Sequence, residues 1–276
     1  METQFVTIKS LHLAYRERNP QSEQIVFFIH GNSSSHRTWN KQLNSELFNN
    51  YHLVAFDLPG CGESLIPKGI EWDYSLLSSG KVIAEGIKQL AGSKPYCLVG
   101  FSYGSSVLSE TLNYSVTPAG ISLLGSCVVG EGIGLDKLLV PGENISFHDD
   151  VSEEKVRQFL SEILKSGNEE EINLHSEDFF LAKPPFRSAL IQSVIQGKLS
   201  DEISLLKSQA IPVQLIFGKE DNLIQVNYLD EKPFAIWKNE IYKLPGAGHY
   251  LHNDQPELFN QLLAEYLEER FKAGCG

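Results

Sequence analysis

Short apolar runs alternate with longer amphipathic stretches along most of the chain. The runs at 5–8 and 11–15 flank a short turn, which predicts an N-terminal hairpin followed by a polar loop at 16–23. Further apolar runs predict strands at 24–29, 52–56, 96–99, 120–124, 212–217 and 239–243. Helical patterns lie at 75–91, 102–113 and 256–271. This alternation predicts an α/β fold with a mainly parallel central sheet flanked by helices.

The alternation stops near residue 126 and resumes near residue 211. Between these points, helical patterns occur at 153–164 and 189–195. We therefore expect one domain over 1–276, with a core at 1–125 and 211–276 and an inserted helical cap at 126–210. Aromatic side chains in this stretch could line a pocket, but their spacing is more typical of ordinary core, so none is assigned to a site: Phe147, Phe159, Phe179, Phe180 and Phe186.

One serine stands in a tight turn directly after an apolar strand. Gly100-Phe101-Ser102-Tyr103-Gly104 follows the run at 95–99 and opens the helix predicted at 102–113. A strand that reverses into a helix within a few residues needs small flanking residues, which Gly100 and Gly104 supply. A G-x-S-x-G match alone is weak evidence, but its strand–turn–helix context favours a nucleophile elbow that presents Ser102.

A serine nucleophile needs a base and an orienting carboxylate, which this type of elbow takes from later in the chain. His249 lies in the loop Gly246-Ala247-Gly248-His249 after a predicted strand. Asp221 follows the strand that ends at Gly218, and its spacing favours it over the adjacent Glu220, which a one-residue change in loop register would put in its place. Ser102, Asp221 and His249 are therefore the predicted catalytic triad.

Two backbone N–H groups should bind the developing oxyanion. The first is predicted to be that of Tyr103, directly after the nucleophile, and the second that of Asn32, in the small-residue loop after the strand at 24–29. In that loop, His30 is expected to order the backbone by hydrogen bonding. Asp57 ends the next strand beside Pro59 and is expected to cap a turn.

Five motifs stand in one order along the chain. They are His-Gly-Asn at 30–32, Asp-Leu-Pro-Gly-Cys-Gly-Glu-Ser at 57–64, the elbow, the acid loop and the Gly-x-Gly-His loop. In this order they resemble the α/β-hydrolase superfamily, which implies an α/β-hydrolase fold and serine hydrolase activity. The segments at 30–35, 57–64 and 237–249 look like the N-acyl-homoserine lactonases of that fold. Those enzymes have Trp-Ser-Leu at the elbow, so Tyr103 is expected to alter the pocket.

Composition and charge narrow the classes of partner. The 23 Lys and Arg against 35 Asp and Glu give a net charge of -12, and no dense basic run is present, so nucleic acid is not an expected partner. The histidines at 36, 52, 148, 175 and 252 are isolated in sequence, without H-x-x-H or H-E-x-x-H spacing. The sequence therefore predicts no metal site, and it gives no sign of a cofactor.

The cysteines and the absence of targeting signals predict the compartment. Cys61, Cys97 and Cys127 sit in or beside apolar runs, and none of the four cysteines has C-x-x-C spacing. We expect a reducing compartment and a disordered tail at 274–276, which contains Cys275. Residues 1–4 do not resemble the start of a signal peptide, and no run reaches the roughly 18 apolar residues of a membrane span, so a cytoplasmic protein without membrane contact is expected.

The residues and the resemblance together predict a metal-independent serine hydrolase that cleaves an ester or lactone through an acyl-enzyme. N-acyl-homoserine lactones are the substrate that the closer resemblance implies. A general carboxylesterase or a C–C bond hydrolase would use the same triad, and both stay open. So does a ligand receptor of the same fold that signals to a protein partner. An epoxide hydrolase or haloalkane dehalogenase is disfavoured, because those enzymes of this fold use an aspartate where this chain has Ser102.

Overall fold

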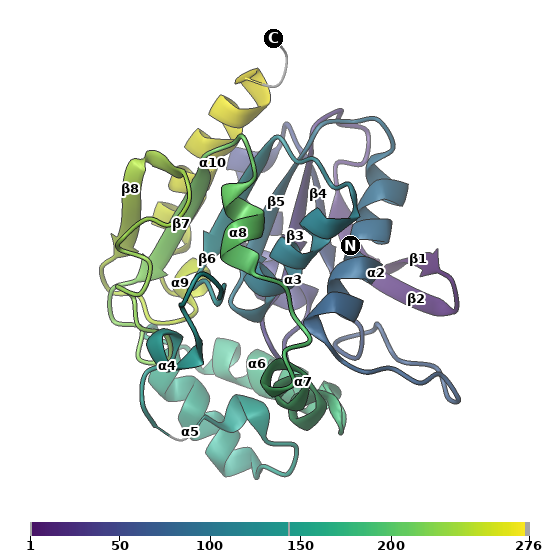
Figure 1. Cartoon of the computed structure of the whole chain (residues 1–276), viewed down its shortest axis with the longest axis vertical. Helices are drawn as coiled ribbons and strands as arrows, with labels where there is room; N and C mark the ends of the chain where they lie inside the picture. The colour runs from purple at the N-terminus through teal and green to yellow at the C-terminus, as the bar shows by residue number, and fades with distance from the viewer. Residues whose placement is uncertain (1, 143, 274–276) are drawn as a thin grey trace.

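Eight strands form one sheet at the centre of the computed structural model, which describes residues 2–142 and 144–273 (Figure 1). Their order in the sheet is β1-β2-β4-β3-β5-β6-β7-β8. The pairs β1–β2 and β2–β4 are antiparallel, and every pair from β4 to β8 is parallel. Their bounds are β1 Gln4–Ile8, β2 Leu11–Arg18, β3 Ile25–Ile29, β4 His52–Phe56, β5 Tyr96–Phe101, β6 Gly120–Leu124, β7 Val213–Gly218 and β8 Ile236–Leu244. The predicted α/β fold with a mainly parallel sheet is confirmed.

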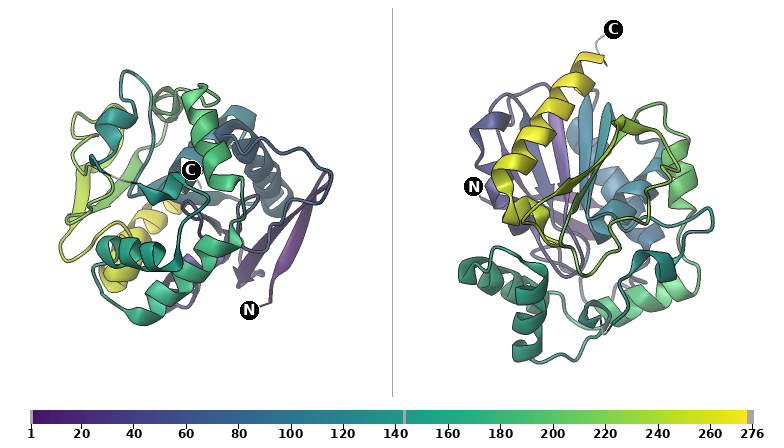
Figure 2. Two further views of the ribbon diagram at one scale, coloured as in Figure 1. Left: turned by 90° about the horizontal axis from the view of Figure 1, so that it is seen from below. Right: turned by 90° about the vertical axis from the view of Figure 1, so that its left-hand side faces the viewer.

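Helices cover both faces of the sheet. α2 (Leu76–Ala91), α3 (Tyr103–Thr111) and α8 (Glu202–Lys207) pack on one face, and α1 (Asn40–Leu43) and α10 (Pro256–Ala273) pack on the other. The right-hand view of Figure 2 shows α10 in yellow along its face. Within β3, Phe27 faces the first layer and Phe28 the second. Strands buried on both faces have continuous apolar runs, which is why they are easily found in the sequence.

Two strands, β2 and β8, differ in their bounds from the prediction. β2 continues to Arg18 through part of the predicted polar loop, because Arg16, Glu17 and Arg18 pair with residues 53–55 of β4. A partner so far along the chain leaves no signal in the local composition. β8 begins at Ile236, three residues early, and a register shift accompanies the positive φ angles of Lys238 and Asn239.

A helical insert lies between β6 and β7. It contains α4 (Leu135–Leu138), α5 (Glu153–Ile163), α6 (Glu169–Leu181), α7 (Phe186–Ile195) and α8. Figure 1 shows α4 to α7 gathered beyond one end of the sheet, at the bottom of the view, while α8 returns along the sheet face. The helices predicted at 153–164 and 189–195 correspond to α5 and α7. The limits of 126–210 for the cap stay a prediction.

Three expectations concern membranes, the cysteines and the C-terminus. Among the helices of residues 2–142 and 144–273, none is long and apolar enough to cross a membrane. Cys61, Cys97 and Cys127 are free thiols. The expected disorder of the tail at 274–276 lies outside the described residues, as does Cys275.

Candidate active site

Ser102 occupies a strained turn between β5 and α3. Its φ of 52° and ψ of −125° are rare for a residue with a side chain, and its N–H donates to the carbonyl of Leu124 at 2.9 Å. The flanking glycines permit close packing: a Cβ on Gly104 would lie 2.4 Å from the carbonyl oxygen of His30. The turn therefore has the elbow geometry that the sequence predicts, and it leaves Ser102 only 8% exposed.

The structure brings the three predicted triad residues together. The Ser102 hydroxyl lies 2.8 Å from Nε2 of His249, and Nδ1 of His249 lies 2.8 Å from Oδ2 of Asp221. The Asp221 carboxylate is fully buried, and its Oδ1 accepts hydrogen bonds from the N–H groups of Leu223 and Ile224. In this arrangement Nδ1–H donates to the carboxylate, which leaves Nε2 to accept the serine proton.

Glu220 takes a different place from Asp221. Its side chain is exposed, and Oε2 accepts a hydrogen bond from the N–H of Ala247 at 3.1 Å. Glu220 therefore supports the loop that carries His249, whereas Nδ1 of the imidazole is bound by Asp221. The catalytic role of Asp221 in place of Glu220 stays a prediction.

The loops that carry the acid and the base pack tightly against each other. A Cβ on Gly218, at the end of β7, would lie 1.9 Å from the carbonyl oxygen of Gly248, so only glycine fits there. The N–H of His249 donates to the carbonyl of Ile163, the last residue of α5. The position of His249 is thereby tied to the helical insert as well as to the sheet.

The two predicted oxyanion residues flank Ser102. Asn32, after β3, and Tyr103, at the start of α3, both line a pocket with Ser102. The Asn32 side chain is fixed, because Nδ2 donates to the carbonyl of Ser146 and Oδ1 accepts from the hydroxyl of Ser33. The Tyr103 hydroxyl donates to Ser79 of α2, so its ring forms part of the pocket wall.

Two histidines order the loops around Asn32. His30 is buried, with Nδ1 bonded to the carbonyl of Gly31 and Nε2 accepting from the N–H of Leu58, as expected of an ordering residue. Burial lowers the pKa of His30. His36, which is isolated in the sequence, donates to Oδ1 of Asp57 from both its backbone N–H and Nδ1, at 2.6 and 2.9 Å.

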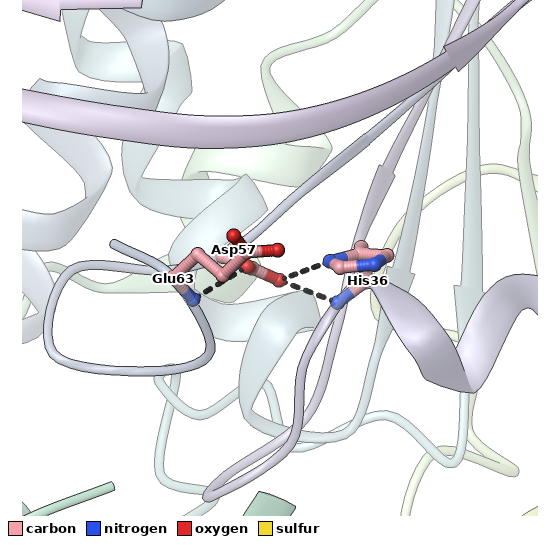
Figure 3. A group of neighbouring side chains, drawn as sticks. All are labelled: His36, Asp57 and Glu63. Atoms are coloured by element: carbon pink, nitrogen blue, oxygen red, sulfur yellow. Dashed lines mark hydrogen bonds and ion pairs between the residues drawn. The ribbon is translucent and has the colours of Figure 1, made fainter. Parts of the chain in front are cut away.

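His36, Asp57 and Glu63 form a compact cluster beside these loops (Figure 3). Their ligand atoms lie within 4.8 Å of one another, a spacing that a metal ion could bridge. However, Oδ2 of Asp57 accepts from the N–H of Glu63, and Arg16 lies 3.7 Å from the Glu63 carboxylate. Burial opposes ionisation of Asp57, but its interactions with His36, with His30 and with the N–H of Glu63 together outweigh burial and lower its pKa. These contacts explain the cluster as a structural one, in which Asp57 links the segment at His36 to the turn at Glu63. Asp57 caps this turn, as expected from the sequence.

An apolar pocket opens beside Ser102. It encloses about 90 Å³ and is lined by α2, α3, α7 and the segment around α4. Its apolar side chains include Leu76, Leu138, Phe147, Leu190 and Val194. Such a lining suits an aliphatic acyl chain, because burial of each methylene group contributes about 0.8 kcal/mol.

A second, small pocket of about 30 Å³ meets the apolar pocket at Ser102. It is lined by His249, Tyr250 and His175, together with Phe159 and Phe179. His249 lines this pocket and is not among the residues that line the apolar one. Ser102 therefore stands between an apolar space and a smaller space on the side of the base.

Sequence reasoning missed several residues of these pockets. Phe147, Phe159 and Phe179 line them, although they were predicted to belong to the core. Phe179 and Phe186 do belong to the buried core, and Phe186 packs edge-on against Tyr103. Cys127, which lies beside an apolar run in the sequence, has its Sγ 3.6 Å from the Ser102 hydroxyl. Burial raises the pKa of this thiol to about 12. Its position at the end of β6, next to the elbow strand, could have signalled this placement.

The fold and this site place the chain among the hydrolases. Residues 26–262 match the alpha/beta hydrolase family, and the chain belongs to that family. It is a hydrolase of the α/β fold. Monoacylglycerol lipase ABHD6 of Rattus norvegicus is 23% identical and is matched over 97% of this chain and 82% of its own length. The uncharacterized hydrolase YugF of Bacillus subtilis is 25% identical, over 95% of this chain and 96% of its own length.

Solved structures share the same fold. A mutant of the N-acyl homoserine lactonase AidH, complexed with N-hexanoyl homoserine lactone, has a TM-score of 0.88 at 18% identity and covers 99% of both chains. An aryl esterase from Burkholderia cenocepacia, described as putative, has a TM-score of 0.81 at 20% identity and covers 98% of this chain and all of its own. The α/β-hydrolase fold with a helical insert is thereby confirmed.

Proposed function

We propose that this protein is a serine hydrolase that cleaves a carboxylic ester or a lactone. The observation that carries the proposal is the unbroken relay from Ser102 through His249 to Asp221, with both links at 2.8 Å, at the meeting point of two pockets. The nucleophile, the base and the orienting acid all come from the chain, so the reaction needs no metal or cofactor to activate the nucleophile.

The mechanism follows from the order of the relay. Ser102 attacks the carbonyl carbon while His249 takes its proton, and Asp221 stabilises the resulting imidazolium. The N–H groups of Asn32 and Tyr103 bind the oxyanion, each worth about 3 kcal/mol. His249 then protonates the leaving oxygen, and afterwards it activates the water that releases the acyl group.

The two pockets favour a substrate with an apolar acyl chain. An acyl chain of moderate length would occupy the apolar pocket, and the alcohol side of the ester would face His249. N-acyl-homoserine lactones combine such a chain with a compact polar ring, and the structures of the N-acyl homoserine lactonase AidH share this fold with TM-scores of 0.88 and 0.87. We infer that they are the substrates to test first.

The test measures proton release from N-butanoyl- and N-decanoyl-homoserine lactone and from aryl esters, with wild-type protein and Ser102→Ala. Ser102-dependent opening of a lactone, well above ester cleavage, is the expected result. Cleavage of esters alone would leave a carboxylesterase and remove the lactonase assignment. Cleavage of a C–C bond in a diketone, with the esters and lactones inert, would favour a C–C bond hydrolase.

A ligand receptor is the remaining alternative. It would bind a lactone or ester with a measurable affinity but turn it over negligibly, and Ser102→Ala would leave the affinity intact. Calorimetric titration beside the hydrolysis assay separates this outcome from an enzyme, for which Ser102→Ala abolishes turnover.

A further inference from the structure

A groove at the surface of the insert lies next to the small pocket. This outer groove encloses about 390 Å³ between α5, the segments 140–142 and 144–145, and residues 222–223. The exposed residues Lys155, Gln158 and Glu162 line it, so it is open to solvent. The small pocket beside Ser102 encloses only about 30 Å³. The residues that separate the two spaces therefore limit the room next to the nucleophile.

Three residues line both the outer groove and the small pocket, namely Phe159, Ile163 and Leu223. Two of them also hold the relay through the backbone. The carbonyl of Ile163 accepts from the N–H of His249, and the N–H of Leu223 donates to Oδ1 of Asp221. Phe159 has the largest side chain of the three and is partly buried on α5. Its side chain can be shortened without removing either of these bonds.

The small pocket lies on the leaving-group side of Ser102. His249 lines it, and His249 is the residue that protonates the leaving oxygen in the proposed reaction. The acyl chain has the separate apolar pocket, with Phe147 among the residues of its wall. The part of the substrate that approaches Phe159 is therefore the alcohol portion of the ester.

We propose that Phe159 is a specificity residue that limits the size of the alcohol portion of the substrate. Its ring closes the small pocket toward the outer groove, so a compact leaving group fits and a bulky one collides with the ring. Methyl and ethyl esters satisfy this limit, and so does a small lactone ring, whose leaving oxygen stays attached to the acyl part. This inference rests on the proposed serine hydrolase function and extends it by naming the class of leaving group.

Two esters of one acid test the proposal, methyl hexanoate and cyclohexylmethyl hexanoate. When both are supplied together, the amounts of the two alcohols released give the ratio of the kcat/KM values. Division by the ratio of their rates of alkaline hydrolysis removes intrinsic reactivity. For wild-type protein this corrected ratio should favour the methyl ester by about tenfold or more, because the ring of Phe159 occupies the space that the cyclohexyl group needs. A corrected ratio of one or less would overturn the proposal without any variant.

Shortening the side chain at position 159 should relax the limit. Phe159→Ala joins the small pocket to the outer groove, so the corrected ratio should fall about tenfold. Phe159→Leu removes less of the side chain and should give an intermediate ratio, and it takes the place of the alanine variant if that variant does not fold. A wild-type ratio in the folded variants would overturn the proposal.

Phe147→Ala is the matched control, because it makes the same change in the other pocket. Phe147 lines the apolar pocket, whereas Phe159 lines the small pocket and the outer groove. Phe147→Ala should keep the wild-type ratio for the two alcohols and change the preference between methyl butanoate and methyl hexanoate. Phe159→Ala should do the reverse. Equal effects of the two variants on the alcohol ratio would show a general loosening of the site and would overturn the assignment to Phe159.

The outcomes separate this inference from the function beneath it. If Ser102→Ala cleaves both esters as well as wild-type protein does, or if no protein cleaves either, the serine hydrolase proposal fails and this one with it. If cleavage depends on Ser102 while the corrected ratio of wild-type protein is near one, only the role of Phe159 fails.

Discussion

Asp221 and Glu220 are neighbours in sequence, yet their carboxylates have different partners. Asp221 holds Nδ1 of His249 and accepts hydrogen bonds from two backbone N–H groups, whereas the Glu220 carboxylate accepts a hydrogen bond from the N–H of Ala247. Position in the loop, rather than residue type, decides which acid can orient the base.

The substitution Asp221→Asn tests this difference. An amide at this position favours the wrong imidazole tautomer, so kcat should fall by about 10⁴. Glu220→Gln is the control, and it should stay within a few-fold of wild-type protein because an amide oxygen can still accept from Ala247. Ester hydrolysis by the two variants gives the comparison, and a greater loss in Glu220→Gln would exchange the roles.

Glu202 is a buried acid outside the relay. Its Oε2 accepts from the N–H of Val129 and the hydroxyl of Ser106, while Oε1 has no partner among the described residues. Burial raises its pKa well above the ordinary value, and nearby Glu110 acts in the same direction. The neutral acid is therefore the form that the folded protein favours.

A pH-dependent contribution to stability follows. The folded protein binds the Glu202 proton more tightly than the unfolded chain, so the stabilisation is complete below the ordinary glutamate pKa and is lost as pH rises through the raised pKa. Urea unfolding at pH 5 and pH 8 should show wild-type protein losing more stability than Glu202→Gln. Identical pH dependence in the two proteins would show that Glu202 does not titrate in this window.

At the scale of elements, α2 and α3 approach closely through one glycine. A Cβ on Gly80 would lie 2.4 Å from the Cβ of Glu110 and 3.1 Å from its backbone carbonyl carbon. This contact sets how near α3, which begins at the elbow, lies to α2. The approach needs a residue without a side chain at position 80.

Gly80→Ala should therefore destabilise the fold. Alanine favours a helix by about 1 kcal/mol, but overpacking of this kind costs about 1 to 3 kcal/mol, so we expect a net loss of the order of 1 kcal/mol in free energy of unfolding. Lys81→Ala, exposed on the same helix, should change it by less than about 0.5 kcal/mol. Urea denaturation of both variants measures the difference, and a stabilised Gly80→Ala would contradict the packing argument.

The strands that helices cover on both faces could be predicted from the sequence, because their apolar runs are unbroken. The continuation of β2 could not, since its pairing with β4 is long-range. The helix α6 was missed although Asn168 caps it and Glu169 to Glu171 follow, which is a recognised start signal. The triad could be predicted from strand ends and glycines, whereas the pocket aromatics depend on how the insert folds back.

At the scale of the whole molecule, Arg187 joins the insert to the loop of the oxyanion residue. It is buried, its Nε donates to the carbonyl of His148, and its Nη1 donates to the Ser33 hydroxyl. Ser33 in turn donates to Asn32. Burial lowers the pKa of Arg187, and the oxygen atoms that accept its hydrogen bonds, together with the Asp149 carboxylate 3.8 Å away, stabilise its charge.

Arg187→Met should weaken both the fold and catalysis. It leaves the His148 and Phe179 carbonyls without this donor, and we expect a loss of about 2 to 4 kcal/mol together with a lower kcat. Arg157→Met is the contrast, because the ion pair between Arg157 and Glu169 lies at the surface and is worth at most about 1 kcal/mol. Thermal melts and ester assays on both variants supply the test, and equal effects would contradict it.

The insert occupies the crossover between β6 and β7, which are hydrogen-bonded neighbours. Ser102, Asp221 and His249 follow β5, β7 and β8 and so lie outside it. In evolution, the sequence of the insert can therefore diverge and change which molecules the protein binds, while the three residues of the relay are retained. Two contacts join the insert to the core, from Arg187 to Ser33 and from His249 to Ile163. An insert of different sequence would have to preserve them.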